Sequence, residues 1–343
     1  MPPGSTKPKP DDLAPSPWLV PAPEKRRGPI HRHTKDRAPV NLFATTVTYL
    51  LFPSTFVAAL VLTATGLARG WEPGIIVGGV AGSVAVLIAL FERLHPAHRE
   101  WNRSRDDIGT DTIHVGVSYI LLPPAFEVAL LALLTQTSAD GAAHIGLDLW
   151  PSNWPIAAQV ALALVASQLP EYWWHRLSHT IPLLWRFHSI HHSSLRLYWL
   201  NAGRFHPVDA MISYSLAMIT VLILGAGPEI LVFVSVWVAV HGLFQHCNIH
   251  LRLGPLNWIF SMAELHRWHH SLNREEANTN YGNNILFWDI VFGTVYWPRD
   301  RDASPQIGLS DLPDFPQNYL GQLAAPFRWS QVIDPRNKEL PKT

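Results

Sequence analysis

The chain has 343 residues, of which 48% are hydrophobic and only 15% are charged, with 26 basic and 26 acidic side chains. This balance of charge gives no indication of nucleic-acid binding, and the single cysteine, Cys247, excludes an internal disulfide framework and a cysteine-ligated iron–sulfur cluster. The apolar residues form long uncharged runs, so the sequence predicts an all-α integral membrane protein rather than two soluble domains.

The N-terminal part contains a tail and two apolar runs. Residues 1–41 are proline-rich and carry eight basic and four acidic residues, which predicts a disordered basic tail in the cytosol. The runs Leu42 to Ala68 and Pro73 to Phe91 have no charge, and each can cross a hydrocarbon core that needs about 20 apolar residues. We therefore expect a transmembrane hairpin over residues 42–92 that returns the chain to the cytosol near Arg93.

Two further spans are expected after this hairpin. A third apolar run, Thr112 to Gln136, is interrupted only by Glu127 and should cross outward, because no Lys or Arg follows it up to Pro155. The run Ile156 to Leu169 should then cross back. It has only 14 residues, so its helix is expected to continue past Pro170 and to present the first histidines at its cytosolic end.

The region Met211 to Phe244 has one charged residue, Glu229, and is broken near its middle by Gly225, Gly227 and Pro228. It is either one long span or a hairpin of two short helices. A single span would place the histidines before and after it on opposite sides of the membrane, whereas a hairpin keeps them together. We therefore predict a broken helical hairpin with two arms of about 16 residues.

Twelve of the 18 histidines fall between His175 and His270, and ten of these form four short groups. Within each group the offsets are three and four residues, which on a helix place the imidazoles on one face and within reach of a single ion. The groups are His175 and His179 in HRLSH, His188, His191 and His192 in HSIHH, His246 and His250 in HCNIH, and His266, His269 and His270 in HRWHH.

This repeated spacing favours metal binding, although a lone histidine in an apolar protein is more often a hydrogen-bonded core residue. Ten imidazoles are too many for one tetrahedral zinc site and suit two five-coordinate ions. Imidazole binds iron, zinc, copper and nickel, so the ligand type does not identify the metal.

Polar neighbours are needed to orient the second nitrogen of each imidazole ligand. The candidates for this role, or for contact with a substrate, are His206, Asp209, Asn248 and Asn280, with Glu171, Asn201, Glu264 and Asp289 as further polar neighbours. Each of them has a solvated or capping role as an ordinary alternative.

The order and spacing of the four groups resemble the fatty acid hydroxylase/sterol desaturase superfamily of membrane di-iron enzymes. The resemblance runs from about Glu92 to Pro298 and includes NYG at Asn280 to Gly282 and WDxxFG at Trp288 to Gly293, two elements expected to fold over the site. It implies that the ten histidines bind two iron ions, for which zinc can substitute in a purified sample. These metals activate dioxygen with externally supplied electrons, and no catalytic side chain beyond the ligands is implied.

The resemblance also implies an architecture. It consists of four transmembrane helices plus the broken helical hairpin, with a cytosolic helical cap that carries the histidine-ligated dimetal site. The catalytic domain would cover residues 93–297, and residues 298–343 would form a proline-rich cytosolic segment. The N-terminus, the C-terminus and the metal site would all lie on the cytosolic side of the membrane.

The implied activity is hydroxylation or desaturation of a C–H bond in a lipid, such as a fatty acyl chain, an ether lipid or a sterol. No haem-binding domain is apparent, so the electrons would come from a separate protein, a ferredoxin, cytochrome b5 or reductase. Within the same superfamily, a sterol C-5 desaturase-type enzyme or a carotenoid oxidase is an alternative. From other classes, a histidine-rich membrane metal transporter and a non-catalytic zinc protein remain open.

Overall fold

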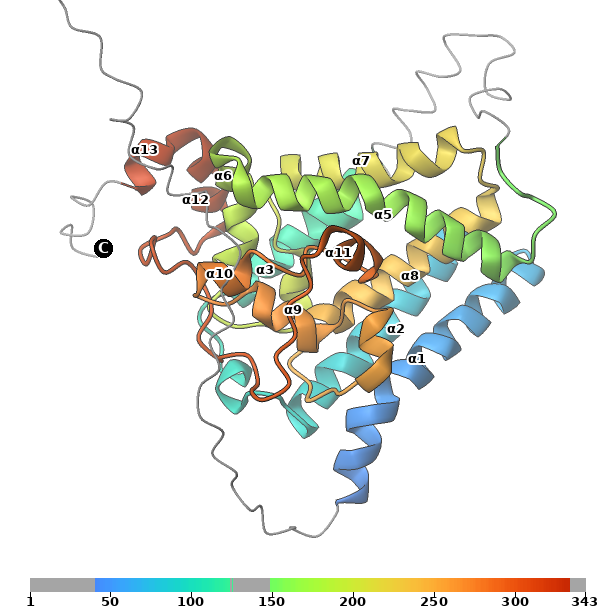
Figure 1. Ribbon diagram of the computed structural model, residues 1–343, viewed down its shortest axis with the longest axis horizontal. Coiled ribbons are helices and arrows are strands. Elements are labelled where there is room, and N and C mark those ends of the chain that lie inside the picture. Colours follow the sequence, from blue (N-terminus) through green and yellow to red (C-terminus); the bar gives the residue numbers. More distant parts are fainter. Residues whose placement is uncertain (1–40, 124, 126–148, 334–343) are drawn as a thin grey trace, which may run out of the picture. The chain divides into compact units, whose positions relative to one another are not determined.

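The computed structural model describes residues 41–123, 125 and 149–333, and these residues are mostly helical (Figure 1). Extended pairing in this part of the chain is limited to three isolated bridges. The principal helices are α1 (Leu42–Ala68), α2 (Pro73–Leu94), α3 (Ile108–Val115), α5 (Ile156–Thr180), α6 (Pro182–His192), α7 (Pro207–Ile223), α8 (Pro228–His246) and α9 (Ala263–His269). Shorter ones are α10 (Arg274–Ala277), α11 (Phe287–Phe292), α12 (Tyr319–Ala324) and α13 (Trp329–Val332), with a π-helix at Gly116–Leu121 and 3-10 turns at Arg99–Asn102, Trp199–Gly203, Gly254–Trp258 and Ala325–Arg328.

Three of the described helices, α1, α2 and α8, are long and apolar enough to cross a membrane. The fourth predicted span forms the first part of α5, which continues through Pro170 as expected. However, α5 is not among the three, because Gln159, Gln168 and Glu171 interrupt its apolar sequence. The third predicted span, Thr112 to Gln136, lies largely outside the described residues, as does the predicted N-terminal tail.

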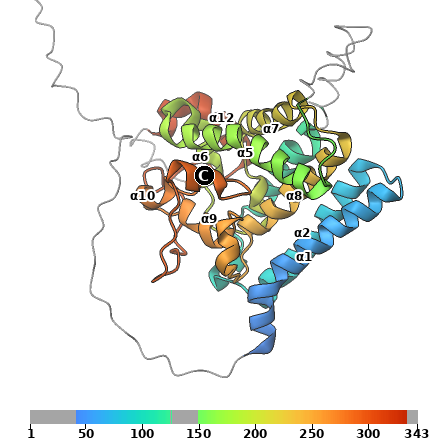
Figure 2. The same ribbon diagram turned by 45° about the vertical axis from the view of Figure 1, so that its right-hand side comes forward.

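The helices α1 and α2 run side by side in opposite directions, as Figure 2 shows. Aromatic side chains fix α1 against α8: the ring of Phe52 lies edge-on to Phe244 with centroids 5.2 Å apart, and that of Phe56 lies edge-on to Trp237 at 4.5 Å. Such edge-to-face pairs add to the free energy gained from burial of the rings. They hold the end of α8, where His246 lies, at a fixed place beside the N-terminal helices.

The region Met211 to Phe244 is divided between the two helices α7 and α8, so the predicted break is confirmed. Gly225 in the connection has a φ of 87°, a left-handed conformation that glycine adopts without steric cost. Pro228 then occupies the first position of α8, where its missing N–H is not needed. Because the chain reverses here, the histidine groups before and after this region lie at the same end of the structure.

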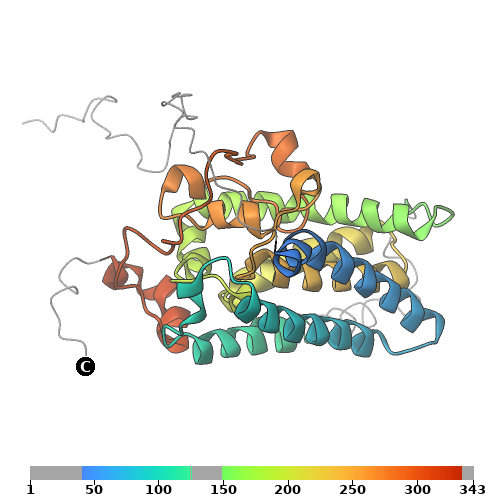
Figure 3. The ribbon, with the colours of Figure 1, turned by 90° about the horizontal axis from the view of Figure 1, so that it is seen from below.

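Residues 315–332 pack at that end as well. Figures 1 and 3 show α12 and α13 (red) beside α6. Phe315 and Ala325 form a small buried cluster with Ile190 of α6, and the side chain of Gln322 contacts His114 of α3 through a 2.8 Å hydrogen bond.

Two buried ion pairs join the start of α3 to the segment between α6 and α7. The guanidinium of Arg196 donates to both carboxylate oxygens of Asp107 at 2.7 and 2.8 Å, and both side chains are 3% exposed. Arg204 donates to Asp111, which also accepts a hydrogen bond from the Tyr198 hydroxyl. These contacts fix the loop that carries Asn201.

Replacement of Asp107 by asparagine would leave the Arg196 guanidinium buried without its counter-charge. We expect the free energy of unfolding to fall by about 3–5 kcal/mol, measured by denaturant unfolding in detergent followed by circular dichroism. Asp106→Asn is the matched control, because Asp106 is exposed and its φ of 59° suits asparagine. Equal effects of the two substitutions would contradict this role of the pair.

Candidate metal centre

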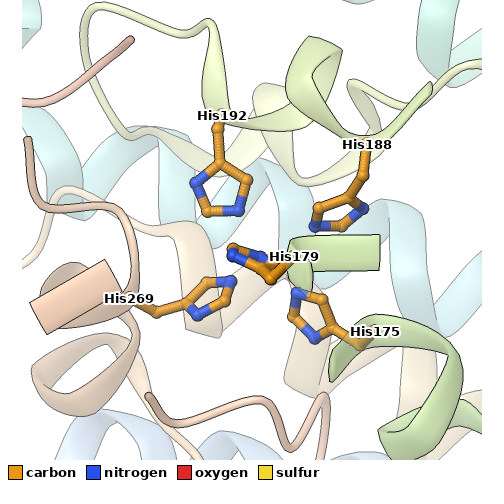
Figure 4. Close-up of side chains that lie close together, drawn as sticks. All are labelled: His175, His179, His188, His192 and His269. Atoms are coloured by element: carbon orange, nitrogen blue, oxygen red, sulfur yellow. The ribbon is translucent and has the colours of Figure 1, made fainter. Parts of the chain in front are cut away.

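Five histidines from three helices form a first group, shown in Figure 4. All are buried, and each offers one ring nitrogen that lies within 4.8 Å of those of the others. The members are His175 and His179 of α5, His188 and His192 of α6, and His269 of α9. The i, i+4 spacing within α5 and within α6 puts each pair on one helix face, as the sequence predicts.

The Nε2 atom of every histidine in the first group is buried and has no hydrogen-bond partner among the described residues. By contrast, Nδ1 is hydrogen-bonded in four of the five rings. Burial of an unpartnered polar atom costs free energy, and five such atoms directed at one another would be strongly unfavourable. A metal cation bound by the five Nε2 lone pairs removes this cost, so the residues present fit a metal ion.

Four histidines form a second group, again with one nitrogen each within 4.8 Å of the others: His191, His246, His266 and His270. The Nε2 atom of His266 lies 2.9 Å from that of His246 and 3.0 Å from that of His270. A single N–H on His266 cannot donate to both of these nitrogens. Nitrogen ligands bonded at right angles to an ion at ~2.0–2.1 Å would be separated by about 2.9 Å, so this spacing also fits a metal site.

The two groups adjoin each other. The rings of His192 and His270, one from each group, stack with centroids 4.5 Å apart. Burial lowers the pKa of His192, His266 and His270 well below the usual range, and the neighbouring imidazoles add to this effect. These rings are therefore neutral at physiological pH, the form in which imidazole binds metals.

Comparison with known proteins agrees with this arrangement. The model of the fatty acid hydroxylase family matches residues 160–294, the segment that contains all nine grouped histidines. The ornithine lipid hydroxylase of Rhizobium tropici is 37% identical over 266 residues, which cover 75% of this chain and 78% of that protein. The chain belongs to the fatty acid hydroxylase family.

More distant relatives share only part of their length with this family member. The alkylglycerol monooxygenase of Danio rerio is 30% identical over 56% of this chain and 44% of its own length. Methylsterol monooxygenase 2-2 of Arabidopsis thaliana is 26% identical over 42% of this chain and 54% of its own. No solved structure matches the chain significantly.

Hydrogen bonds to Nδ1 orient the histidines of both groups. Asp209, one of the residues predicted to contact a ligand, lies 2.9 Å from His188 Nδ1, and the Asn201 side-chain oxygen lies 3.1 Å from His246 Nδ1. In the other contacts the acceptors are Tyr281 O for His175 at 2.7 Å, Asn278 Oδ1 for His179 at 3.2 Å, and Thr279 O for His269 at 2.8 Å.

Three of these acceptors were not predicted from the sequence. Asn278 was not among the polar neighbours named as candidates. The other two are the main-chain carbonyls of Tyr281 and Thr279, which no side-chain pattern can indicate.

The loop that supplies these carbonyls is held by the buried carboxylate of Asp289. Asp289 accepts hydrogen bonds from the backbone N–H groups of Tyr281 and Gly282, both at 2.8 Å, and from the Thr294 hydroxyl at 2.7 Å. A Cβ on residue 282 would lie 2.4 Å from the carbonyl oxygen of Ile285, so only glycine fits there. In this way the NYG and WDxxFG segments fold beside the histidines and orient His175.

The structure does not bring His250 to either group, so the ten-histidine set needs a correction at this residue. The reason is local: α8 ends at His246, and Cys247 is extended, with a φ of −60° and a ψ of 144°. An offset of four residues places two side chains on one face only within a continuous helix. The ring of His250 instead lies edge-on to His95, with centroids 5.8 Å apart.

Three other predicted neighbours of the ligands have structural contacts. His206 caps α7 by accepting from Val208 N, and its Nε2 lies 3.3 Å from the carbonyl oxygen of Leu323. The Asn248 side chain bonds the backbone of His98 and the side chain of Asn102. Asn280, at a positive φ of 51°, bonds the carbonyls of Leu265 and Tyr296. None of these contacts involves a grouped histidine.

Substitution of a grouped histidine and of His250 should distinguish a metal ligand from a histidine that does not bind metal. We expect His192→Ala to lose metal, because it removes one of the five converging Nε2 atoms. His250→Ala is the control, because it removes an imidazole from the same HCNIH motif as His246. This variant should retain the wild-type content of metal per chain. The metal content is measured by elemental analysis of the purified protein. Equal losses in the two variants would contradict the nine-histidine assignment.

Asp209→Asn tests the orientation of His188. The asparagine side chain removes the negative charge that fixes the Nδ1–H tautomer, and we expect metal affinity to fall about 10- to 100-fold. The measurement is competition with a chelator of known affinity. Asp314→Asn, at an exposed carboxylate, should leave the affinity unchanged. An Asp209→Asn protein with wild-type affinity would show that the carboxylate does not support the ligand.

Proposed function

We propose that the two histidine groups bind two iron ions and that the enzyme uses dioxygen and externally supplied electrons to hydroxylate a C–H bond of a membrane lipid. The observation that carries this proposal is the pair of adjoining groups of five and four buried imidazoles, whose converging nitrogens have almost no other partner in the part of the chain that the structure describes. A saturated C–H bond offers no acidic or basic handle, so its oxidation needs a metal-based oxidant. Bound iron would supply dioxygen activation.

The protein's own residues contribute positioning and exclusion of water. Asp209 and Asn201 hold one imidazole in each group, and Asp289 holds the loop that covers the first group. The side chains of all nine histidines are buried, so bulk water is excluded from the site. Exclusion of water protects reactive species from side reactions.

The substrate class follows from the relatives. The relative of which this chain covers 78% is named an ornithine lipid hydroxylase, and others are named alkylglycerol and methylsterol monooxygenases. All act by name on lipids, and all are named for hydroxylation or oxygen insertion rather than desaturation. An acyl chain of a polar membrane lipid is therefore the proposed substrate. A metal transporter is not favoured, because the histidines gather at the ends of the helices and form no line along them.

The site is proposed to face the cytosol, together with both termini. Arg93 lies in the last turn of α2, and Arg99, Arg103 and Arg105 follow it. The end of α2 lies at the same end of the structure as His246, because Glu92 accepts a hydrogen bond from the backbone of Asn248. An excess of basic residues in short loops marks the cytosolic side. The electron donor, a separate ferredoxin, cytochrome b5 or reductase, would then reach the site from the cytosol.

The proposal is tested on the purified full-length protein. We expect two iron ions per chain, oxygen uptake on reduction in the presence of a lipid extract, and one atom of labelled oxygen in a lipid product detected by mass spectrometry. His191→Ala should lose iron and product together, while Asp314→Asn should retain both. A single redox-inert ion per chain, or product without label from dioxygen, would overturn the proposal.

A further inference from the structure

A small cavity lies on the side of α9 away from the two histidine groups. It has a volume of about 60 Å³, enough for several water molecules or one small oxyanion, since ~10–15 Å³ of such space holds one water. Its polar wall contains the guanidiniums of Arg252, Arg267 and Arg301, the imidazoles of His98 and His250, and the carboxylates of Glu264 and Asp302. The histidine that sequence spacing assigned to the metal site therefore faces a different site.

Arg267 is the unusual group in this wall. It is 7% exposed, yet its hydrogen bonds within the described part of the chain are made only by Nη2, to the carbonyl oxygens of Cys247 and Ile249 at 2.9 Å. Its Nε has no partner, and no carboxylate forms an ion pair with it among the described residues. A buried guanidinium without a counter-charge is costly, and an anion in the adjoining cavity would offset that cost.

The other charged groups in the wall are already paired. Arg252 bonds Glu264 at 2.7 Å and also bonds Asp302, while Arg301 bonds Glu276 at 2.7 Å. Both carboxylates of the wall are thus turned toward Arg252. The donors without a protein acceptor in the described part of the chain are Nε of Arg267 and the rings of His98 and His250.

The pKa values of His98 and His250 are both lowered, chiefly by burial. Burial lowers the pKa of His250, and the charges of Arg252 and Arg267 lower it further. Burial and the charge of Arg267 act in the same way on the pKa of His98. Neutral rings of this kind still donate one N–H each to an oxyanion.

The cavity lies beside the first turns of α1. The backbone N–H of Arg252 donates to the carbonyl oxygen of Thr48 in α1, and an isolated bridge pairs Ile249 with Pro96, two residues after the end of α2. Thr48 is six residues into α1, or about 9 Å along a helix that rises 1.5 Å per residue. A membrane-spanning α1 would place this point close to the boundary between headgroups and hydrocarbon.

We propose that this cavity is an oxyanion-binding site, in which Arg267, His98 and His250 bind a phosphate group, either free or as part of a lipid headgroup. The site is separate from the metal ligands, and the proposal does not depend on the reaction that they catalyse. Basic pockets at the cytosolic ends of membrane helices are suited to lipid phosphates.

The test uses the full-length, metal-loaded protein in a phosphate-free detergent solution. Binding is measured by calorimetry and by the thermal unfolding temperature with three probes: inorganic phosphate, short-chain dihexanoyl phosphatidylglycerol, and dihexanoylglycerol, which lacks the phosphate. We expect saturable binding of a phosphate-bearing probe and none of dihexanoylglycerol. Binding of inorganic phosphate identifies a free anion as a ligand, whereas binding of phosphatidylglycerol alone identifies a lipid headgroup. Absence of binding by both phosphate probes overturns the proposal.

Variants locate the site. Arg267→Gln keeps a polar side chain but removes the charge, and we expect affinity to fall about tenfold or more, as for loss of a charge-assisted hydrogen bond. Arg299→Gln is the matched control, because Arg299 stacks on Trp297 near the cavity but does not line it. Equal affinities of the two variants would overturn the assignment.

A second substitution covers the case in which Arg267→Gln does not fold, as judged by its metal content. His250→Phe fills the cavity without removing a ring hydrogen bond, and it should abolish phosphate binding while the metal content per chain stays at the wild-type value. Retained phosphate binding in His250→Phe would place the anion elsewhere and overturn the proposal.

Discussion

The structure depends on the convergence of neutral imidazole nitrogens in a buried interior. Each Nε2 of the first group has been removed from water and has no partner within residues 41–123 and 149–333, which is unfavourable unless a cation takes the lone pairs. Hydrogen bonds to the other ring nitrogen support this arrangement. Asp209, Asn201 and Asn278 and two loop carbonyls accept from Nδ1, so the remaining nitrogen of each ring points inward. The protein thus supplies the geometry, and a bound cation would supply the missing attraction.

This convergence constrains how the chain crosses the membrane. The ligands come from α5 and α6 on one side of the apolar region Met211 to Phe244, and from the end of α8 and from α9 on the other. They meet only because Gly225 and Pro228 let the chain reverse between α7 and α8. The position of the N-terminal helices is fixed at the same place. Glu92 at the end of α2 accepts hydrogen bonds from the backbone N–H groups of Trp199, which precedes α7, and Asn248, which follows α8.

Much of this arrangement was predictable from the sequence, because helical spacing is a local property. The offsets in HRLSH, HSIHH and HRWHH predicted eight histidines that the structure places in the two groups, and His246 of HCNIH is the ninth. The need to keep the histidines on one side of the membrane predicted the broken hairpin. The prediction was wrong at His250, where the spacing was helical but the helix had ended. Spacing also could not assign ligands to groups: His191 and His192 are neighbours in the chain, yet they belong to different groups because successive side chains of a helix diverge by about 100°. Carbonyl acceptors such as Tyr281 O leave no trace in the side-chain sequence.

The two histidine groups are chemically unequal although their side chains are of one type. The first group has five imidazoles and a buried carboxylate, Asp209, bonded to one of them, which raises the basicity of that ligand. The second group has four imidazoles, its observed support is the neutral amide of Asn201, and the buried cation Arg267 directly follows His266 in the chain. A negative charge beside one site and a positive charge near the other stabilise different oxidation states of a bound metal. The fold therefore builds two electrostatically different sites from nine identical side chains, and an anion bound at Arg267 would reduce that difference from outside the ligand set.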